Sequence, residues 1–356
     1  MSVRITASSW GVVALLIATG LGAGCKTPSS SGSTKTDAAF DAAPVVSAHA
    51  EPSASVAKPP SLRADAGCSD DSWCPIMSVK KGSLHAIWGT STGNLYALWS
   101  GYLVHFDGEQ WQPLHGFDTR RLWAVTGSEP ANVWAVGDDG AALHFDGKWA
   151  ETATGVKTTL RGAFARAVDD VWAVGLEGTI LHWDGHRWTR TPTPTLPSKD
   201  AKGSTKAELL GAWASDAKNA WAVGADGLVL HWDGTAWTVS SSGTQFGLGT
   251  VTGTGPNDVW TAGDGGTLLH WDGKKWLHSF SGTKQALFAL WAEEPSNAWA
   301  VGDAGTILHW DGSAWVLSAS GTEDELHGIW GPIGRDLWLV GFSGKTGQTS
   351  TWRRHR

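Results

Sequence analysis

Six histidines recur at one position of a repeated phrase, and such a set raises the question of a metal centre. They are His105, His144, His182, His231, His270 and His309. A zinc ion requires its nitrogen ligands about 2.0–2.1 Å away. Equivalent positions on successive repeats of a ring are too far apart to share one ion. We therefore expect each histidine to bond to a backbone group or an Asp of its own repeat, and we predict no metal and no cofactor.

The turns of the repeat carry two sets of acids. One Asp follows each histidine in the phrase His-Trp-Asp-Gly or His-Phe-Asp-Gly, where its carboxylate can accept hydrogen bonds from hairpin N–H groups. The second set occupies another turn and comprises Asp138, Asp139, Glu177, Asp226, Asp264 and Asp303. We expect this acidic rim on one face, where its negative potential could attract a cation or a basic partner. Solvated turn acids without a partner are the plainer interpretation.

The residue types needed for covalent or acid–base catalysis form no recognisable pattern. No nucleophile–base arrangement and no pair of carboxylates stands out. Arginines cluster in the early repeats without a matching pattern: Arg120, Arg121, Arg161, Arg166, Arg187 and Arg190. We therefore predict no catalytic residues and no enzyme.

The elements that position these residues form a sevenfold repeat. The phrase Asp170–Gly175 recurs around Trp134, Trp172, Trp221, Trp260, Trp299 and Trp338, with Tyr96 in a weaker first copy. The spacings of these aromatics are 38, 38, 49, 39, 39 and 39 residues, and a Leu stands 12 residues before each. Such a period indicates a repeat architecture. We expect these aromatics to pack in the core rather than to bind a ligand.

Each repeat reads as four short strands. Examples are Leu326–Trp330, Val171–Val174, Thr306–Trp310 and a strand that begins at the Trp after Asp-Gly. Their nearly continuous apolar character predicts burial on both faces, and Asp-Gly predicts a hairpin. Seven such units of about 39 residues predict an all-β, seven-bladed β-propeller.

The closure of the ring can be predicted because the last repeat lacks a fourth strand. Trp73 lies 11 residues before Leu84, the spacing found in the other repeats. The segment from Trp73 to Val79 should therefore complete the last blade. Cys68 and Cys74 flank this segment, and in an oxidising compartment we expect them to form a disulfide worth about 2 kcal/mol. Two unpaired thiols are the alternative.

Composition limits the class of protein. The chain has 356 residues, a formal net charge of −7, 46 Gly, 25 Trp and 3 Cys. A mildly acidic chain lacks the basic footprint of a nucleic-acid binder. Three cysteines are too few for a disulfide-framework mini-domain or a four-cysteine zinc site.

The N-terminus predicts export. An apolar run from Gly11 to Ala23 is too short to span a bilayer but suits a secretory signal. The site Leu21-Gly22-Ala23-Gly24-Cys25 resembles a bacterial lipoprotein signal, although Gly22 holds the usual place of Leu. The resemblance implies a signal peptide at 1–24 and a lipid on Cys25; ordinary secretion is the alternative. Residues 25–66 should be a disordered tether rich in Ser, Ala and Pro, followed by the propeller at 67–356.

One connection is ten residues longer than the others. It lies within residues 191–207 and adds Lys199, Asp200, Lys202 and Lys206. Binding residues often lie on such loops, so it is a candidate contact loop on the face of the acidic turns. A tolerated insertion is the alternative.

The line Val301–Gly312 followed by Trp315 resembles the repeats of Asp-box (BNR-type) propellers and of the photosystem II assembly-factor propellers. His309 stands where the Asp-box family has Ser or Thr, and only three residues separate Asp311 from Trp315. The repeats are also similar to those of tectonin-type propeller lectins. Some Asp-box members are sialidases, which use three arginines and a Tyr–Glu pair, but the body holds only Tyr96 and Tyr102.

These features predict a monomeric, non-enzymatic binding or scaffold propeller, because the fold alone fixes no function. We expect lipid anchoring in the cell envelope, at the outer membrane or cell surface, with periplasmic or secreted protein as the alternative. The expected partner is an envelope protein or a glycan. A tectonin-like lectin is the alternative function, and an Asp-box glycoside hydrolase is a third.

Overall fold

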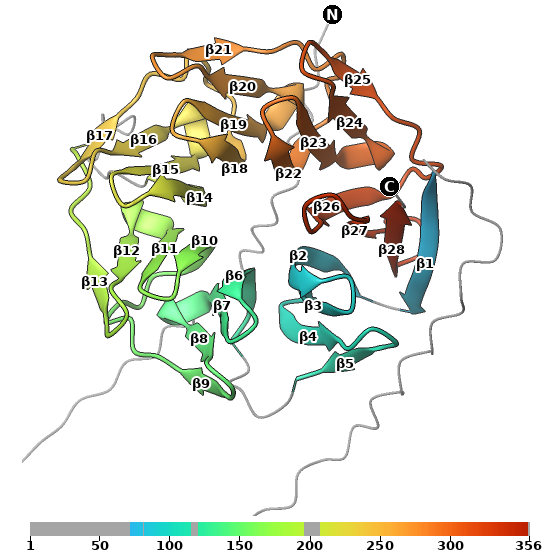
Figure 1. The fold of residues 1–356 in the computed structure, drawn as a ribbon, viewed down its shortest axis with the longest axis horizontal. Helices are drawn as coiled ribbons and strands as arrows, with labels where there is room; N and C mark the ends of the chain where they lie inside the picture. The colour runs from blue at the N-terminus through green and yellow to red at the C-terminus, as the bar shows by residue number, and fades with distance from the viewer. Residues whose placement is uncertain (1–71, 81, 115–119, 196–206, 355–356) are drawn as a thin grey trace, which may run out of the picture. The chain divides into compact units, whose positions relative to one another are not determined.

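The computed structural model describes residues 72–80, 82–114, 120–195 and 207–354, which belong to a compact unit spanning Ala57–Arg356. These residues form seven four-stranded antiparallel sheets arranged as blades around a ring (Figure 1). The predicted seven-bladed β-propeller is confirmed. Cys25, Cys68 and the candidate contact-loop residues Lys199, Asp200, Lys202 and Lys206 lie outside the described residues. Within the described residues, no helix has the length and apolarity needed to cross a bilayer.

The first three blades follow chain order from the inside of the ring outward. Blade 1 contains β2 (Leu84–Ser91), β3 (Asn94–Trp99), β4 (Tyr102–Phe106) and β5 (Trp111–Pro113). Blade 2 contains β6 (Leu122–Glu129), β7 (Asn132–Gly137), β8 (Ala142–Phe145) and β9 (Trp149–Glu151). Blade 3 contains β10 (Leu160–Ala167), β11 (Asp170–Gly175), β12 (Ile180–Trp183) and β13 (Trp188–Arg190).

The next three blades repeat this order. Blade 4 contains β14 (Leu209–Asp216), β15 (Asn219–Gly224), β16 (Val229–Trp232) and β17 (Trp237–Val239). Blade 5 contains β18 (Leu248–Gly255), β19 (Asp258–Gly263), β20 (Leu268–Trp271) and β21 (Trp276–His278). Blade 6 contains β22 (Leu287–Glu294), β23 (Asn297–Gly302), β24 (Ile307–Trp310) and β25 (Trp315–Leu317).

Blade 7 joins the two ends of the folded chain, as the spacing predicted. It contains β26 (Glu325–Trp330), β27 (Leu337–Phe342), β28 (Gln348–Arg354) and, as its outermost strand, β1 (Trp73–Lys80). β1 pairs antiparallel with β28, with Trp73 opposite Arg354, so the last blade has its full complement of four strands. Cys74 is buried in β1 and takes part in a disulfide. Its pairing with Cys68 stays a prediction.

The core lies between neighbouring blades, which explains the apolar character of both strand faces. Trp134 of blade 2, for example, packs with Leu160 of β10 and Trp188 of β13 in blade 3. The repeated aromatics predicted to be core are all buried: Tyr96, Trp134, Trp172, Trp221, Trp260, Trp299 and Trp338. Each blade therefore buries its surface only when its neighbour is in place.

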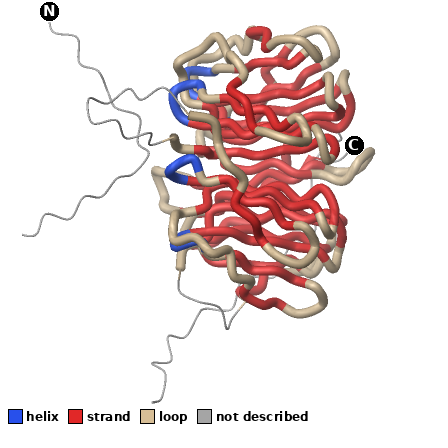
Figure 2. Tube along the Cα trace, turned by 90° about the vertical axis from the view of Figure 1, so that its left-hand side faces the viewer, coloured by secondary structure: helices blue, strands red, loops and turns tan. Residues whose placement is uncertain are grey.

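Short 3₁₀ turns join the second and third strands of blades 2 to 6. They are η1 (Asp138–Gly140), η2 (Leu176–Gly178), η3 (Ala225–Gly227), η4 (Asp264–Gly266) and η5 (Asp303–Gly305). In the side view these turns lie along one side of the ring (Figure 2), which we call the η face. The glycine before each turn is extended, and it is required for close approach: a Cβ at Gly302 would lie 1.9 Å from the Ala286 carbonyl oxygen.

The middle residue of each η turn has a left-handed backbone. In η5 this residue is Ala304, with φ 50°, whereas blade 5 places Gly265 there. A left-handed conformation costs a residue with a Cβ about 1 kcal/mol. We predict that Ala304→Gly raises the free energy of unfolding by about 1 kcal/mol, measured by urea denaturation. Ala319→Gly, at a position without positive φ, should give no gain, and an equal gain there would contradict the argument.

Candidate interaction site on blades 1 to 3

The recurrent histidines are structural. In each of blades 1 to 6 the histidine Nε2 donates to the side chain of the Asn or Asp that begins the second strand, at 2.6–3.3 Å. Each ring also packs on the repeated aromatic of its blade, as His144 does on Trp134 at a centroid distance of 3.9 Å. The expectation of a partner within the same blade is confirmed, and Asn is the more frequent partner.

In blades 1, 3, 4, 5 and 6 the Asp that follows the histidine accepts hydrogen bonds in the outer hairpin, as predicted. The Asp311 carboxylate accepts hydrogen bonds from the backbone N–H groups of Ser313 and Ala314 and from the Ser313 hydroxyl. These bonds, led by the Ser313 hydroxyl, lower the pKa of Asp311 to about 2. Asp107, Asp184, Asp233 and Asp272 accept the same pair of backbone bonds.

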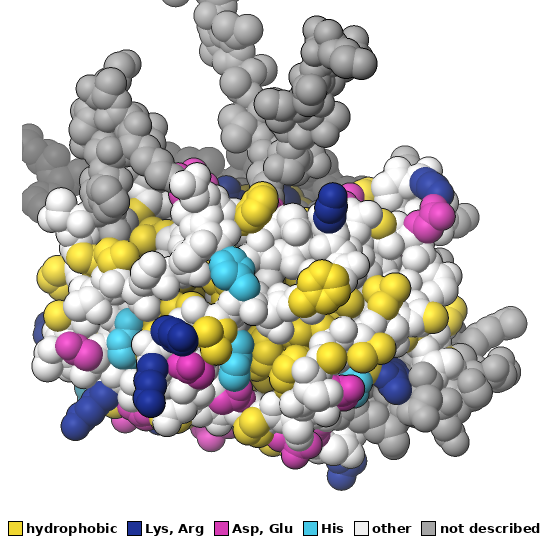
Figure 3. All heavy atoms as spheres, turned by 90° about the horizontal axis from the view of Figure 1, so that it is seen from above, with side chains coloured by type: hydrophobic (Ala, Val, Ile, Leu, Met, Phe, Trp, Pro, Cys, Tyr) yellow, Lys and Arg dark blue, Asp and Glu magenta, His cyan; other side chains and the backbone are white. Residues whose placement is uncertain are grey.

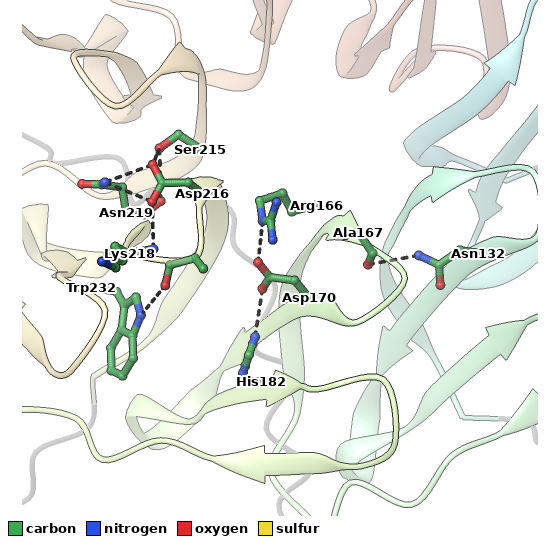
Figure 4. A network of polar contacts seen from close by, with 11 residues as sticks. Asn132, Arg166, Ala167, Asp170, His182, Ser215, Asp216, Lys218, Asn219 and Trp232 are labelled. Atoms are coloured by element: carbon green, nitrogen blue, oxygen red, sulfur yellow. Dashed lines mark hydrogen bonds and ion pairs between the residues drawn. The ribbon is translucent and has the colours of Figure 1, made fainter.

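The edge opposite the η face carries a network that joins blades (Figure 4). The Asp170 carboxylate accepts from Arg166 at 2.5 Å and from His182 at 2.8 Å. The Asn132 side chain donates to the Ala167 carbonyl of the next blade. These contacts hold strand ends together, so the arginine of this network has a structural partner rather than an open site.

The acidic rim lies on the η turns, but its members differ in environment. Asp138 is engaged, because its carboxylate accepts from Trp123 Nε1 at 2.7 Å and from the Thr159 hydroxyl at 3.1 Å. The Asp303 carboxylate accepts from the N–H of Ala304. The η turns also bind the residue before the inner strand, as Asp138 N does with the Arg121 carbonyl oxygen. The rim acids therefore share the η face with the start of each inner strand.

One position departs from the uniformity of the repeat. It is the residue after the Leu that recurs in each inner strand: His85, Trp123, Arg161, Leu210, Gly249, Phe288 and His327. A shift of register leaves this residue unpaired in the ladder between the first two strands, as Arg161 is between Leu160 and Gly162. Such β-bulges re-aim a side chain and are common beside binding sites. We call these seven residues the bulge ring.

Two arginines contact one tryptophan of the bulge ring. The guanidinium carbons of Arg121 and Arg161 lie 4.0 and 3.8 Å from the centroid of the Trp123 ring. Both arginines are therefore within cation–π distance of the same indole. Burial lowers the pKa of Arg161, while Asp138 and Glu208 raise it. The Arg161 Nε is buried and has no hydrogen-bond partner among the described residues.

A histidine pair occupies the ring where blades 7 and 1 meet. The His85 and His327 rings lie 5.1 Å apart in an edge arrangement, and Phe288 of blade 6 stacks on His327 at 5.0 Å. His327 Nε2 donates to the Glu325 carboxylate at 3.1 Å. Burial is the main cause that lowers the pKa of both histidines to about 4. Both are therefore neutral near pH 7.

Blade 1 leaves an open pocket on the η face. Its second and third strands are joined by the tight turn Ser100–Gly101, both with positive φ, in place of a 3₁₀ turn. The resulting pocket of about 330 Å³ is lined by Ser83, His85, Ser100, Tyr102 and Arg121. The Ser83 hydroxyl and His85 Nε2 are hydrogen-bonded at 2.6 Å. Because Arg121 also contacts Trp123, the pocket adjoins the arginine pair.

We call this combined surface the blade 1–3 cluster. It consists of Ser83, His85, Ser100, Tyr102, Arg121, Trp123 and Arg161. Arg121 and Arg161 were recognisable in the sequence only as members of an arginine-rich region, and neither Trp123 nor His85 was predicted as a site residue. A signal was present in the sequence, because the residue after the recurrent Leu varies in size and charge from repeat to repeat within an otherwise regular strand.

The described residues contain no group of three or more His, Cys, Asp or Glu side chains placed to hold a metal ion. The candidate contact loop of 191–207 meets the η face at its described end, where Gly178 N donates to the Ala207 carbonyl oxygen. Its remaining residues stay a prediction.

Neither a family model nor a curated protein matches this sequence. Several solved structures have a fold similar to that of this propeller. The WD40 repeats of RRP9 align with a TM-score of 0.65 and 11% identity, covering 83% of this chain and 100% of that one. YCF48 from Cyanidioschyzon merolae aligns with a TM-score of 0.62 and 16% identity, covering 80% and 98%.

A second YCF48 structure is bound to D1 peptide and aligns with a TM-score of 0.59 and 16% identity, covering 80% of this chain and 95% of that one. At these identities the likeness concerns the fold alone. The predicted similarity to the photosystem II assembly-factor propellers therefore holds for the architecture.

Proposed function

We propose that this protein is a non-enzymatic binding or scaffold propeller of the cell envelope that engages a protein partner through the blade 1–3 cluster. The observation that carries the proposal is the arginine pair on Trp123, with its buried unpartnered Nε, next to an open pocket. The anchor is the lipid predicted on Cys25, which would place the propeller at a membrane.

The cluster suits a partner segment that bears a carboxylate. Guanidinium groups bind carboxylates through paired, charge-assisted hydrogen bonds, and stacking on Trp123 holds both groups in position before a partner arrives. Tyr102 offers an exposed ring and Ser100 a hydroxyl at the same pocket. That a propeller of this fold, YCF48, is found bound to a peptide supports the choice of a peptide over a small metabolite.

The test combines capture with quantitative binding. The chain from residue 25 onward, immobilised through its C-terminus, is used to capture partners from an envelope extract, and the segment bound is then synthesised and titrated. Arg121→Ala and Arg161→Ala should each weaken that peptide at least tenfold, because a charge-assisted hydrogen bond contributes about 1.5–3 kcal/mol. Arg187→Ala, on the exposed hairpin of blade 3, is the matched control.

A glycan array run with the same protein separates the alternatives. If Arg121→Ala and Arg161→Ala bind the peptide as tightly as Arg187→Ala does, the blade 1–3 cluster does not contribute to the interaction. Saturable binding of a sugar at several equivalent sites, unaffected by either arginine change, would instead favour the tectonin-like lectin.

A further inference from the structure

The open pocket of blade 1 holds a hydroxyl and an imidazole in direct contact. The Ser83 hydroxyl and His85 Nε2 lie 2.6 Å apart, and both residues line the pocket together with Arg121. Among the seven repeats, blade 1 alone has a hydroxyl residue and a histidine at these two positions, and blade 6 has Ala286 and Phe288 there. The propeller repeat therefore does not require the pair.

The charge of the imidazole decides which atom of this pair donates the hydrogen bond. Nε2 of a neutral ring can accept the Ser83 hydrogen, whereas both nitrogens of an imidazolium can only donate. Protonation of His85 therefore makes the Ser83 oxygen the acceptor and directs the Ser83 hydrogen to another partner. An anion in the pocket would then gain that hydrogen bond and a second positive charge beside Arg121.

Several charged groups act on His85, either directly or through His327. The His327 ring of β26 lies 5.1 Å from the His85 ring, and His327 donates to the Glu325 carboxylate. Burial, followed by the charges of His327 and Arg121, lowers the pKa of His85 to about 4. Burial also lowers the pKa of His327, against the opposing effect of Asp303 in η5. The titratable or charged side chains around His85 are therefore Tyr102, Arg121, Asp303, Glu325 and His327.

We propose that His85 makes anion binding in the blade 1 pocket pH-dependent, so that the pocket binds a partner carboxylate more tightly in acid than at neutral pH. This inference rests on the proposed function, which assigns a carboxylate of the partner to the blade 1–3 cluster. A bound anion favours the imidazolium and raises the pKa of His85, and an adjacent opposite charge changes a pKa by about 1–3 pH units. Affinity therefore rises as the pH falls from 7, and the gain is complete below the pKa of His85 in the empty pocket.

Other histidines of the propeller supply a control. Histidine side chains appear on the outer wall of the ring (Figure 3). In this wall β21 carries the exposed His278, whose Nε2 lies 3.4 Å from the Gly243 carbonyl oxygen. Blade 4 has Val239 at the same position of the repeat. His278→Val therefore removes a histidine that does not line the pocket, and it should leave anion binding there unchanged.

The test measures anion binding directly, with sodium sulfate as the probe. Sulfate keeps its charge between pH 7 and 5, so any pH dependence in this range comes from the protein. The chain from residue 25 onward, with Cys25→Ser, is titrated with sulfate at constant ionic strength, and the histidine ring signals are followed by proton NMR. We expect the sulfate dissociation constant to be at least about threefold lower at pH 5 than at pH 7. Sulfate should also raise the pKa of His85.

Replacing each histidine of the pair separates their roles. His85→Leu, with the residue that blade 4 has as Leu210, should give equal dissociation constants at the two pH values. His327→Phe, with the residue that blade 6 has as Phe288, should keep the gain and move it to higher pH, because His327 lowers the pKa of His85. Circular dichroism checks the fold of each variant at both pH values.

The outcomes distinguish this inference from the proposed function. Equal sulfate dissociation constants at pH 7 and 5 in the unaltered chain overturn the pH dependence. A gain that survives in His85→Leu also overturns it, because Glu325 or another group would then be the cause. If Arg121→Ala binds sulfate as tightly as the unaltered chain at both pH values, the pocket is not the anion site. That result removes the basis of the proposed function as well.

Discussion

Replacing Trp134 by alanine is expected to lower the free energy of unfolding by about 4 kcal/mol, within the range for removing a large core aromatic. Trp134 has no solvent-exposed surface, and its Nε1 donates to Asn132 Oδ1 at 2.9 Å. Its ring also meets Trp183 and Trp188 of blade 3 at centroid distances of 4.9 and 5.1 Å. The substitution therefore opens a cavity between two blades and leaves the Asn132 oxygen with one donor fewer.

The measurement is urea denaturation followed by tryptophan fluorescence and by circular dichroism. Trp310→Ala is the matched control, because Trp310 lies on the third strand of blade 6, is only half-buried and donates to the Pro295 carbonyl near the surface. Trp310→Ala should therefore lower the free energy of unfolding much less than Trp134→Ala does. Trp310 also touches the neighbouring blade, at a centroid distance of 5.0 Å from Trp260, so the two variants differ mainly in how deeply the lost ring is buried. A loss at Trp134 no larger than the loss at Trp310 would show that complete burial between blades adds little to the stability.

Acidification is expected to destabilise the propeller through the His85–His327 pair. Burial lowers the folded-state pKa of each histidine from 6.5 to about 4, so the unfolded chain binds more protons than the folded chain between these values. Stability is therefore complete above pH 6.5 and falls as the pH drops toward 4. A shift of this size corresponds to about 3 kcal/mol for an independent group, and the two histidines titrate as a coupled pair.

Other groups face the pair or titrate in the same window. Arg121 lowers the pKa of His85 further, whereas Asp303 raises that of His327. Burial raises the pKa of Glu325, which opposes the loss of stability. Burial also lowers the pKa of His105, His144 and His231. The contribution of the His85–His327 pair to the acid sensitivity can therefore be measured only by replacing both histidines.

The repeat itself supplies the variants. Blade 4 has Leu210 where blade 1 has His85, and blade 6 has Phe288 where blade 7 has His327. The double variant His85→Leu, His327→Phe should flatten the decline in unfolding free energy between pH 6.5 and 4. Phe288→Leu, which changes a non-titrating neighbour of His327, should leave the slope as in the wild type. An unchanged slope in the double variant would mean that other groups cause the acid sensitivity.

The repeat made the architecture predictable from sequence. Seven copies of one pattern average out the ambiguity of any single strand, and the register of Leu, Trp and Asp-Gly fixes four strands per unit. The residues with a recurring role were predictable for the same reason: the buried Trp172, the hydrogen-bonded His182 and the hairpin Asp184 have counterparts in blades 1 to 6. The closing strand at Trp73 followed from a spacing that only a closed ring requires.

The candidate sites depend on contacts between blades, and sequence does not encode these locally. Arg121 and Arg161 stand 40 residues apart, and only the ring places both on Trp123. His85 and His327 come from opposite ends of the folded chain and meet because the ring closes there. Tertiary packing decided two further features. One is the bulge that leaves Arg161, His85 and His327 outside the ladder between the first two strands. The other is the short turn that opens the pocket of blade 1. The sequence alone determined the fold and its repeated supports, because these need only periodicity. The three-dimensional ring determined which departures from the repeat share a surface.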